Sequence, residues 1–188
     1  IDSSKKTGDG HPELVGAPLS VNGLREDLQI SHKALSAWLG ALERLYALFR
    51  LAPLGSPRIR AVKKQQKHYH LDWSVVKADA ARFENLVACH LLKWVHYEQD
   101  VRGRDLELRY FRDLEGREVD FVVTDGARVR LLVECKWSDA EPDRGLRYLK
   151  TRFPGAEAWQ VCAVGRKSFQ TPDGIRIAPA VELLKTLV

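Results

Sequence analysis

The sequence predicts an α/β protein in two parts: a small helical module with two strands, then a mixed sheet flanked by helices. Three observations predict this. Apolar residues recur at helical spacing between residues 18 and 51 and again between residues 80 and 97. Three strand-like runs separated by turn sequences lie between residues 106 and 137. At 188 residues, the chain is long enough to bury a core.

The composition is that of a globular protein, with 45% hydrophobic and 29% charged residues. No apolar run approaches the roughly 18 residues of a membrane span, and the polar N-terminus does not read as a signal peptide. The three cysteines are odd in number, widely spaced and set in apolar runs, which predicts reduced, buried thiols and not disulfides or a zinc cluster. We therefore expect a cytoplasmic protein without a membrane partner.

The start of the chain is unusual. It begins at Ile1 and contains no methionine. Either the chain is a fragment of a longer protein or modified methionines are missing from the sequence, and we favour a fragment.

Residues 1–16 predict a flexible lead-in, and residues 17–72 a winged-helix-like module. Ser20 is expected to cap a short helix, Gln29-Ile30 to break it, and Ser31 to cap a second helix. LFRLAP then predicts a strand, GSP a turn, and IRAVKKQQKHYHLD a second, basic strand. Two helices joined by a short turn and followed by two strands are typical of a winged helix.

The net charge of +5 is concentrated in this module, because residues 54–71 hold five basic residues and no acidic one. Such a stripe is the electrostatic pattern of a contact with phosphate groups, and side chains at the start of the second helix are placed to reach DNA. A solvated, lysine-protected strand edge and a protein-contact module are the alternatives. The candidate nucleic-acid-binding residues are His32, Lys33, Arg58, Arg60, Lys63, Lys64 and Lys67.

Residues 73–188 predict the second domain. Asp79 is expected to cap a long helix from Ala80 to about Tyr97. The expected elements that follow are strands at 106–113, 117–125 and 127–137, a helix at 143–153, a strand at 158–165 and a closing helix at 179–188.

Polar residues stand at intervals within two of these strands. In RLLVECKW, strand alternation places Glu134 and Lys136 on the face opposite Leu131 and Val133. In REVDFVV, we expect Val119, Phe121 and Val123 to face the core, so that Asp120 lies opposite them. A hairpin through Asp125-Gly126 makes the strands neighbours, which predicts that Asp120, Glu134 and Lys136 share one face.

Carboxylates and a lysine within apolar strands indicate a site, because burying them is otherwise costly. Paired carboxylates hold Mg²⁺, and a nearby ammonium orients the attacking water. Asp120, Glu134 and Lys136 therefore predict phosphodiester hydrolysis.

VDFVV and VECKW resemble the D…(E)xK signature of the PD-(D/E)XK nuclease superfamily, which includes restriction enzymes and archaeal Holliday-junction resolvases. The resemblance implies a restriction-endonuclease-like mixed sheet. It also implies catalytic roles for Asp120, Glu134, Lys136 and Glu84, with Mg²⁺ held by Asp120, Glu134 and, as in the resolvases, Glu84 on the preceding helix. The sequence lacks the proline before Asp120.

Residues 19–187 also resemble the conserved C-terminal region of a large group of prokaryotic AAA-type ATPases, a domain of unknown function. The landmarks include KHYHLDWSVV, ARFENLV, RYFRDLEGREVDFVV and LLVECKW. The resemblance implies an upstream ATPase domain as partner. No Gly-x₄-Gly-Lys-Ser/Thr loop occurs in the chain, so ATP is expected only in that upstream domain.

Two hypotheses follow. In the first, this C-terminal part of an ATPase is a Mg²⁺-dependent DNA endonuclease. In the second, it is a catalytically inactive, nuclease-like module that contacts DNA or a protein partner, and pure protein contact is a third reading. A homo-oligomer is left open. The histidines at 68, 70, 90 and 96 lack partners at ligand spacing and are expected to pack or to lie on the surface.

Overall fold

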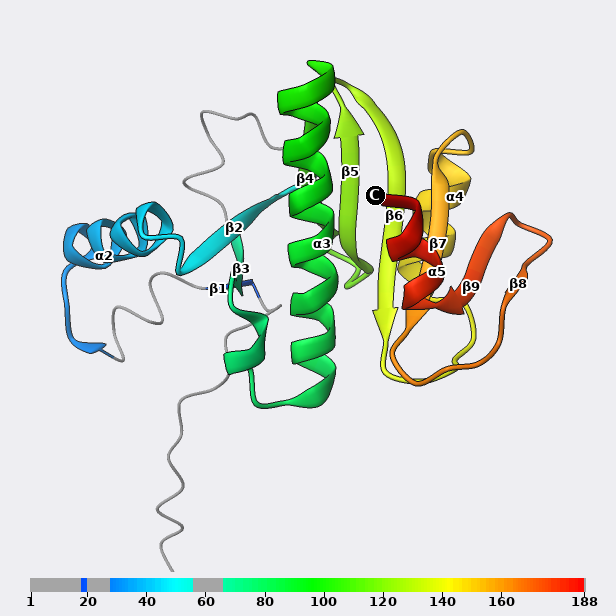
Figure 1. The fold of residues 1–188 in the computed structure, drawn as a ribbon, viewed down its shortest axis with the longest axis horizontal. Coiled ribbons are helices and arrows are strands. Elements are labelled where there is room, and N and C mark those ends of the chain that lie inside the picture. Colours follow the sequence, from blue (N-terminus) through cyan, green and yellow to red (C-terminus); the bar gives the residue numbers. More distant parts are fainter. Residues whose placement is uncertain (1–17, 20–27, 56–65, 188) are drawn as a thin grey trace, which may run out of the picture.

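The computed structural model describes residues 18–19, 28–55 and 66–187. In these ranges the chain forms a mixed α/β fold, in which nine strands make one sheet (Figure 1). The strand order is β1-β3-β2-β4-β5-β6-β7-β9-β8. Neighbours pair antiparallel except β2–β4, β6–β7 and β7–β9, which are parallel. The predicted α/β class is confirmed.

The strands and helices have the following bounds. The strands are β1 (Pro18–Leu19), β2 (Leu48–Pro53), β3 (Gln66–His70), β4 (Leu106–Arg112), β5 (Glu118–Asp125), β6 (Arg128–Lys136), β7 (Glu157–Cys162), β8 (Phe169–Gln170) and β9 (Ile175–Pro179). The α-helices are α2 (His32–Arg44), α3 (Asp79–Arg102), α4 (Arg144–Arg152) and α5 (Ala180–Leu184), and the 3₁₀ helices are η2 (Trp73–Val75) and η3 (Lys185–Leu187).

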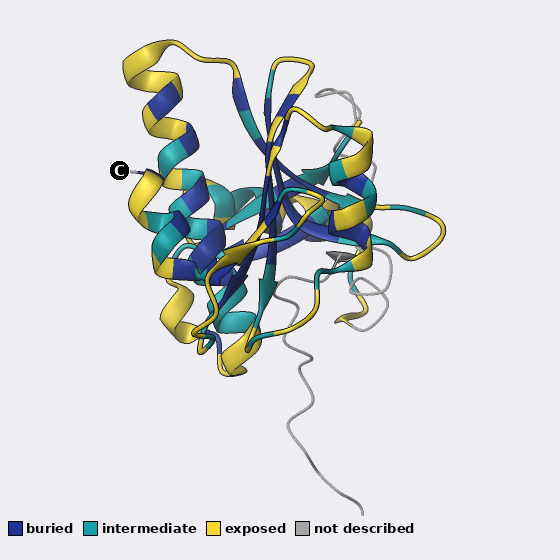
Figure 2. Cartoon of the chain, turned by 90° about the vertical axis from the view of Figure 1, so that its right-hand side faces the viewer, coloured by how far each residue is buried: buried dark blue, intermediate teal, exposed yellow. Residues whose placement is uncertain are grey.

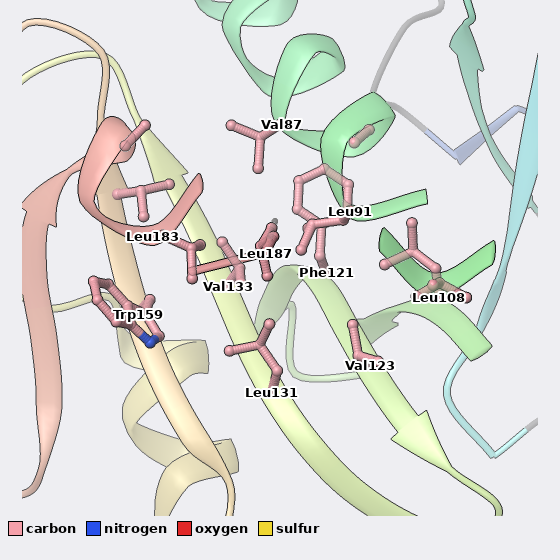
Figure 3. Close-up of a cluster of buried hydrophobic side chains, with 14 of the residues drawn as sticks. Val87, Leu91, Leu108, Phe121, Val123, Leu131, Val133, Trp159, Leu183 and Leu187 are labelled. Atoms are coloured by element: carbon pink, nitrogen blue, oxygen red, sulfur yellow. The ribbon is translucent and has the colours of Figure 1, made fainter. Parts of the chain in front are cut away.

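Helices cover both faces of the sheet. One face packs against α3, α5 and η3 through a core that includes Val87, Leu91, Phe121, Val133 and Leu183 (Figure 3). The other face packs against α4. Figure 2 shows the buried residues gathered along the sheet, with exposed surface outside them. Because both faces are buried, Leu132 lies in the core under α4 and not on an open face.

The long helix α3 is confirmed but its bounds differ from the prediction. It begins at Asp79, with Ala78 as its N-cap and no side-chain cap bond, so the expected capping by Asp79 is wrong. Asp79 lies in the first turn instead and pairs with Arg82. The helix runs on to Arg102 and ends where Gly103 takes a left-handed φ of 62°.

Three of the elements predicted for the first module are found in its described part, which does not establish a winged helix. Ser31 caps α2, since its Oγ accepts a hydrogen bond from the Ala34 N–H at 3.1 Å. The predicted break is seen at Gln29, whose φ is 54°. β2 has the predicted bounds, and β3 covers part of the second predicted strand. The lead-in, most of the helix expected after Ser20, and residues 56–65 lie outside the described residues.

The sheet continues across the predicted domain boundary at residue 73. β2 pairs with β3 and also with β4, at Ala52↔Arg109 and Pro53↔Tyr110. Tyr69 of β3 belongs to the same buried core as α3. The β2–β3 hairpin is therefore part of the main sheet and not a free-standing wing.

The three central strands are confirmed, with a register shift in each of their two pairings. In the β4–β5 pairing, Arg109 pairs with Val122 and Phe111 with Val119, so one residue of β4 lies opposite two residues of β5. The extra residue reverses the alternation, which places Val119 in the α4-side core while Phe121 stays in the α3-side core. The expectation that Val119 and Phe121 share a face is wrong for this reason.

The C-terminal third holds two strands that the sequence did not predict. α4 and β7 are confirmed, and β8 and β9 form a further antiparallel pair at the edge of the sheet. Pro179, the expected first residue of the closing helix, is the last residue of β9, so the helix begins at Ala180. β8 has two residues and β9 five, which is too short for periodicity to show.

The first turn of α4 packs directly on the backbone of β5. A Cβ atom added to Gly145 would lie 2.1 Å from the carbonyl oxygen of Glu118. We predict that Gly145→Ala lowers the free energy of unfolding by about 2–4 kcal/mol, because α4 or β5 has to move. Urea denaturation followed by circular dichroism measures the change.

Gly40→Ala is the matched control, since Gly40 lies in α2 with no atom within 4 Å of an added Cβ. It should leave stability unchanged or raise it by roughly 0.5–1 kcal/mol. Equal effects of the two substitutions would contradict the close approach of α4 to β5.

Candidate functional site

The two predicted acids of the central hairpin lie where β5 and β6 separate. Phe121↔Val133 is the last register pair of the two strands toward this end. Beyond it the Asp120 N–H donates to Glu134 Oε2 at 3.2 Å, and the Cys135 N–H donates to Asp120 Oδ2 at 3.0 Å. Side-chain carboxylates thus replace the ladder hydrogen bonds. Asp120 and Glu134 are only 8% and 7% exposed, so the structure brings both into the interior.

The outer oxygens of these carboxylates turn toward different layers. Asp120 Oδ1 faces Lys67 on β3, and Glu134 Oε1 faces Lys136, which in turn contacts Asp143 at the start of α4. The expectation of one shared face for Asp120, Glu134 and Lys136 is therefore wrong. The extra residue in β5 is the physical reason, because it turns Asp120 toward the α3 side.

The first group of charges, the Lys67 cluster, consists of Lys67, Glu84, Glu118 and Asp120. Lys67 Nζ lies 2.7 Å from Glu118 Oε1, 3.1 Å from Asp120 Oδ1 and 3.4 Å from Glu84 Oε1. The Tyr69 hydroxyl donates to Glu84 Oε1 at 2.7 Å. Lys67 is 1% exposed. The buried ammonium of Lys67 thus contacts three carboxylates, one from α3 and two from β5.

Lys67 was predicted to bind nucleic acid, and its burial corrects that expectation. In a strand, Lys67 shares a face with Tyr69, and Tyr69 is fully buried against the core. His32 and Lys33 lie exposed at the start of α2, as expected. Arg58, Arg60, Lys63 and Lys64 lie outside the described residues.

The pKa values in the Lys67 cluster follow from burial and mutual charge. Burial alone would lower the pKa of Lys67, but the charges of Asp120, Glu84 and Glu118 outweigh it and raise the pKa above its ordinary value. Burial, followed by the charge of Asp120, raises the pKa of Glu84 to about 7, although Lys67 opposes this. Lys67 therefore stays charged, while Glu84 is poised to hold a proton near neutral pH.

The second group, the Lys136 cluster, consists of Glu134, Lys136 and Asp143. Lys136 Nζ lies 2.8 Å from Glu134 Oε1 and 2.9 Å from Asp143 Oδ2. Asp143 is the N-cap of α4, and its backbone N–H donates to Gln160 Oε1 at 2.8 Å. Gln160 also donates to the carbonyl oxygens of Ala140 and Glu141, so this buried amide fixes the loop that carries Asp143.

Burial dominates the titration of Glu134. It raises the pKa of Glu134 to about 8, helped by the charge of Asp120 and opposed by Lys136. For Asp143, burial alone would raise the pKa, but hydrogen bonds from Lys136 and from the Gly145 N–H hold it below its ordinary value. For Lys136, burial alone would lower the pKa, but the charge of Glu134 and hydrogen bonds to Glu134 and Asp143 raise it.

Four residues of the site were not predicted: Glu118, Asp143, Asn85 and Gln160. Asn85 follows Glu84 on α3, and its side chain bonds both the N–H and the carbonyl oxygen of His70 at the end of β3. The burial of Lys67 was also not predicted. The available signal was strand alternation, which places Lys67 on the same face as the aromatic Tyr69. Asp143 was recognisable as an N-cap, but its contact with Lys136 depends on the placement of α4 and no local pattern predicts it.

The side chains do not fit the Mg²⁺ site that the resemblance implies. Glu84 and Asp120 belong to one cluster and Glu134 to the other, and an ammonium already stands among the carboxylates of each. In the part of the chain that the structure describes, no three side chains among His, Cys, Asp and Glu are arranged to hold a metal ion. Cys89, Cys135 and Cys162 are free thiols, as predicted, but only Cys162 is fully buried.

Fold and site together define a mixed α/β domain with two lysine–carboxylate clusters, one around the buried Lys67 and one around the half-buried Lys136, at the open end of a hairpin. The family comparison matches residues 80–183, more than half of the chain, to a domain of unknown function, DUF4143. The chain belongs to this family, which is known in AAA-ATPase-associated proteins. A second domain of unknown function, DUF8612, matches residues 10–85. Comparison with curated proteins and with solved structures gives no match.

A membrane span was not expected, and the described helices agree. Within residues 28–55 and 66–187, no helix combines the length and the apolar character needed to cross a bilayer.

The raised pKa of Glu134 predicts a pH-dependent stability. Glu134 has a pKa of about 8 in the folded protein, against an ordinary value of 4.5, so the folded chain binds this proton more tightly than the unfolded chain. Its contribution to the free energy of unfolding is therefore largest at low pH and falls as the pH rises from about 4.5 to about 8. Urea denaturation at several pH values should show the native protein losing stability relative to Glu134→Gln across this range.

Glu157→Gln, an exposed change on β7, is the control and should follow the native protein at every pH. If the difference between native protein and Glu134→Gln is independent of pH, the predicted proton on Glu134 is absent.

Proposed function

We propose that this chain is a nuclease-like, non-cleaving module of an AAA-type ATPase that contacts DNA. Membership of DUF4143 supports the link to the ATPase. The nuclease-like part of the proposal rests on the signature formed by Asp120, Glu134 and Lys136.

One observation carries the non-cleaving part of the proposal. The three carboxylates expected to ligate a metal are divided between two clusters, and a lysine ammonium already lies among the carboxylates of each cluster. A divalent ion needs several oxygen ligands that converge on one point. A buried ammonium ion among the same oxygens competes for that point and repels a second cation.

The lysine of the signature is also engaged. Orienting an attacking water requires an ammonium that can turn to the substrate. Lys136 Nζ is held by Glu134 and Asp143 at 2.8 and 2.9 Å, and Asp143 is itself fixed by Gly145 and Gln160. These contacts favour a structural role for Lys136 over a catalytic one.

DNA contact is supported by the exposed start of α2. Ser31 caps this helix at the Ala34 N–H, and the side chains of His32 and Lys33 beside it are exposed. A helix N-terminus with a neighbouring lysine suits a phosphate group. The basic residues between 58 and 64 belong to the same module in the sequence.

A cleavage assay tests the non-cleaving proposal. Native protein is incubated with branched, single-stranded and duplex DNA in Mg²⁺ or Mn²⁺, beside Lys136→Ala. We expect the same background rate for both, because no metal is held at the site. Native protein that cuts at least about tenfold faster than Lys136→Ala would establish an endonuclease instead, since loss of one catalytic group typically costs that much or more.

A binding assay tests the contact with DNA. Neutralising Lys33 should weaken binding and reduce the slope of log K against log salt by about 1, the effect of one lost phosphate contact. Lys93→Ala removes an exposed lysine of α3 and should leave the slope unchanged. Glu134→Gln should bind like native protein. Binding that is independent of salt and of Lys33 would exclude α2 as the DNA contact.

A further inference from the structure

The position of Lys67 disagrees most sharply with the metal site expected from the sequence. Its ammonium lies within 3.4 Å of oxygens from three carboxylates, and its side chain is 1% exposed. Tyr110 places its ring 5.7 Å from the same nitrogen, which leaves the ammonium enclosed by acids and an aromatic face. A monovalent organic cation thus stands where several oxygens converge.

We propose that Lys67 is a built-in counter-ion that closes the group of Glu84, Glu118 and Asp120 to divalent cations. Removing its charge should convert this group into a divalent-cation site. The inference rests on the proposed function and deepens it, because it names the residue that prevents divalent cations from binding in one of the two clusters of the same site. It also assigns a role to Glu118, which the nuclease signature does not include.

Charge balance favours this role. Without Lys67, three carboxylates would remain together in the interior, where an unpaired charge is costly. They can be neutralised by protonation or by a cation that enters from solvent. A cation from solvent would reach the carboxylates at Glu118, because the side chain of Glu118 is 32% exposed while that of Asp120 is 12% exposed. Three carboxylates are a hard-oxygen donor set that suits Mn²⁺, Ca²⁺ or Mg²⁺.

Further contacts hold Lys67 in place. The Tyr69 hydroxyl bonds Glu84, and Asn85 bonds the backbone of His70 through both of its side-chain groups. Two consecutive residues of α3 therefore fasten two successive positions of β3. These bonds hold β3, the strand that carries Lys67, against α3.

The experiment measures Mn²⁺ binding by the full chain. Lys67→Met and Lys67→Gln remove the charge, Lys67→Arg keeps it, and Lys93→Met removes an exposed lysine elsewhere. Free Mn²⁺ is followed by electron paramagnetic resonance, and melting temperatures are compared in Mn²⁺ and in EDTA. The neutral variants should bind Mn²⁺ with a Kd of roughly 10⁻⁴–10⁻³ M, the range of weak oxygen sites. Native protein, Lys67→Arg and Lys93→Met should bind at least about tenfold more weakly.

The neutral variants are expected to be unstable in EDTA, because they leave the carboxylates unpaired. Mn²⁺ should raise their melting temperature by about 5–10 °C at concentrations well above Kd, and should leave that of native protein unchanged. Adding Glu118→Gln should remove this Mn²⁺ effect. If Mn²⁺ neither binds to nor stabilises any neutral variant, folded or unfolded, Lys67 does not occupy a cation site.

The outcome is separable from that of the proposed function. Cleavage by native protein would overturn the non-cleaving module whatever the variants bind. A failure of the neutral variants to gain Mn²⁺ binding, with native protein inert toward DNA, would overturn only the role of Lys67.

Discussion

The structure depends on the way buried carboxylates are neutralised at the end of the β5–β6 hairpin. Asp120 and Glu134 stand where ladder hydrogen bonds stop, and each accepts a backbone N–H from the other strand. Their outer oxygens need positive partners, because an interior carboxylate without one is strongly destabilising. Lys67 supplies the partner on the α3 side and Lys136 on the α4 side.

Under the proposed function, this arrangement is the reason why a sequence that resembles the nuclease signature would not cleave DNA. Spacing along a strand fixes which residues are near one another, but the local course of the strand fixes where their oxygens turn. One extra residue in β5 directs Asp120 to one layer, while Glu134 keeps the direction of β6. Asp120 and Glu134 therefore remain neighbours at the end of the hairpin, while their outer oxygens contact different lysines.

The sequence predicted most elements that are long or have clear ends. Ser31 as a cap, the bounds of β2, the three central strands and the cysteines as free thiols were all correct. Prediction failed where the deciding contact is distant in sequence. The irregularity in β5 arises from pairing with β4, and the contact of Asp143 with Lys136 arises from the docking of α4. Lys67 was assigned to a surface stripe because its neighbours are basic, although Tyr69 two positions later marked the inner face of the strand.

The narrow contact between β2 and β4 has a mechanical consequence. These strands share the register pairs at Ala52 and Pro53, a bond from Arg109 Nη1 to the Pro53 carbonyl at 3.3 Å, and a bond from the Leu54 N–H to the Tyr110 carbonyl at 2.7 Å. Pro53 has no N–H of its own to donate. The sheet is thus continuous in topology but has a seam, and a cooperative opening of the N-terminal strands would begin there. The buried ammonium of Lys67 spans this seam, so tension on the N-terminal strands would be transmitted to Asp120 and α3 as work against an ion pair.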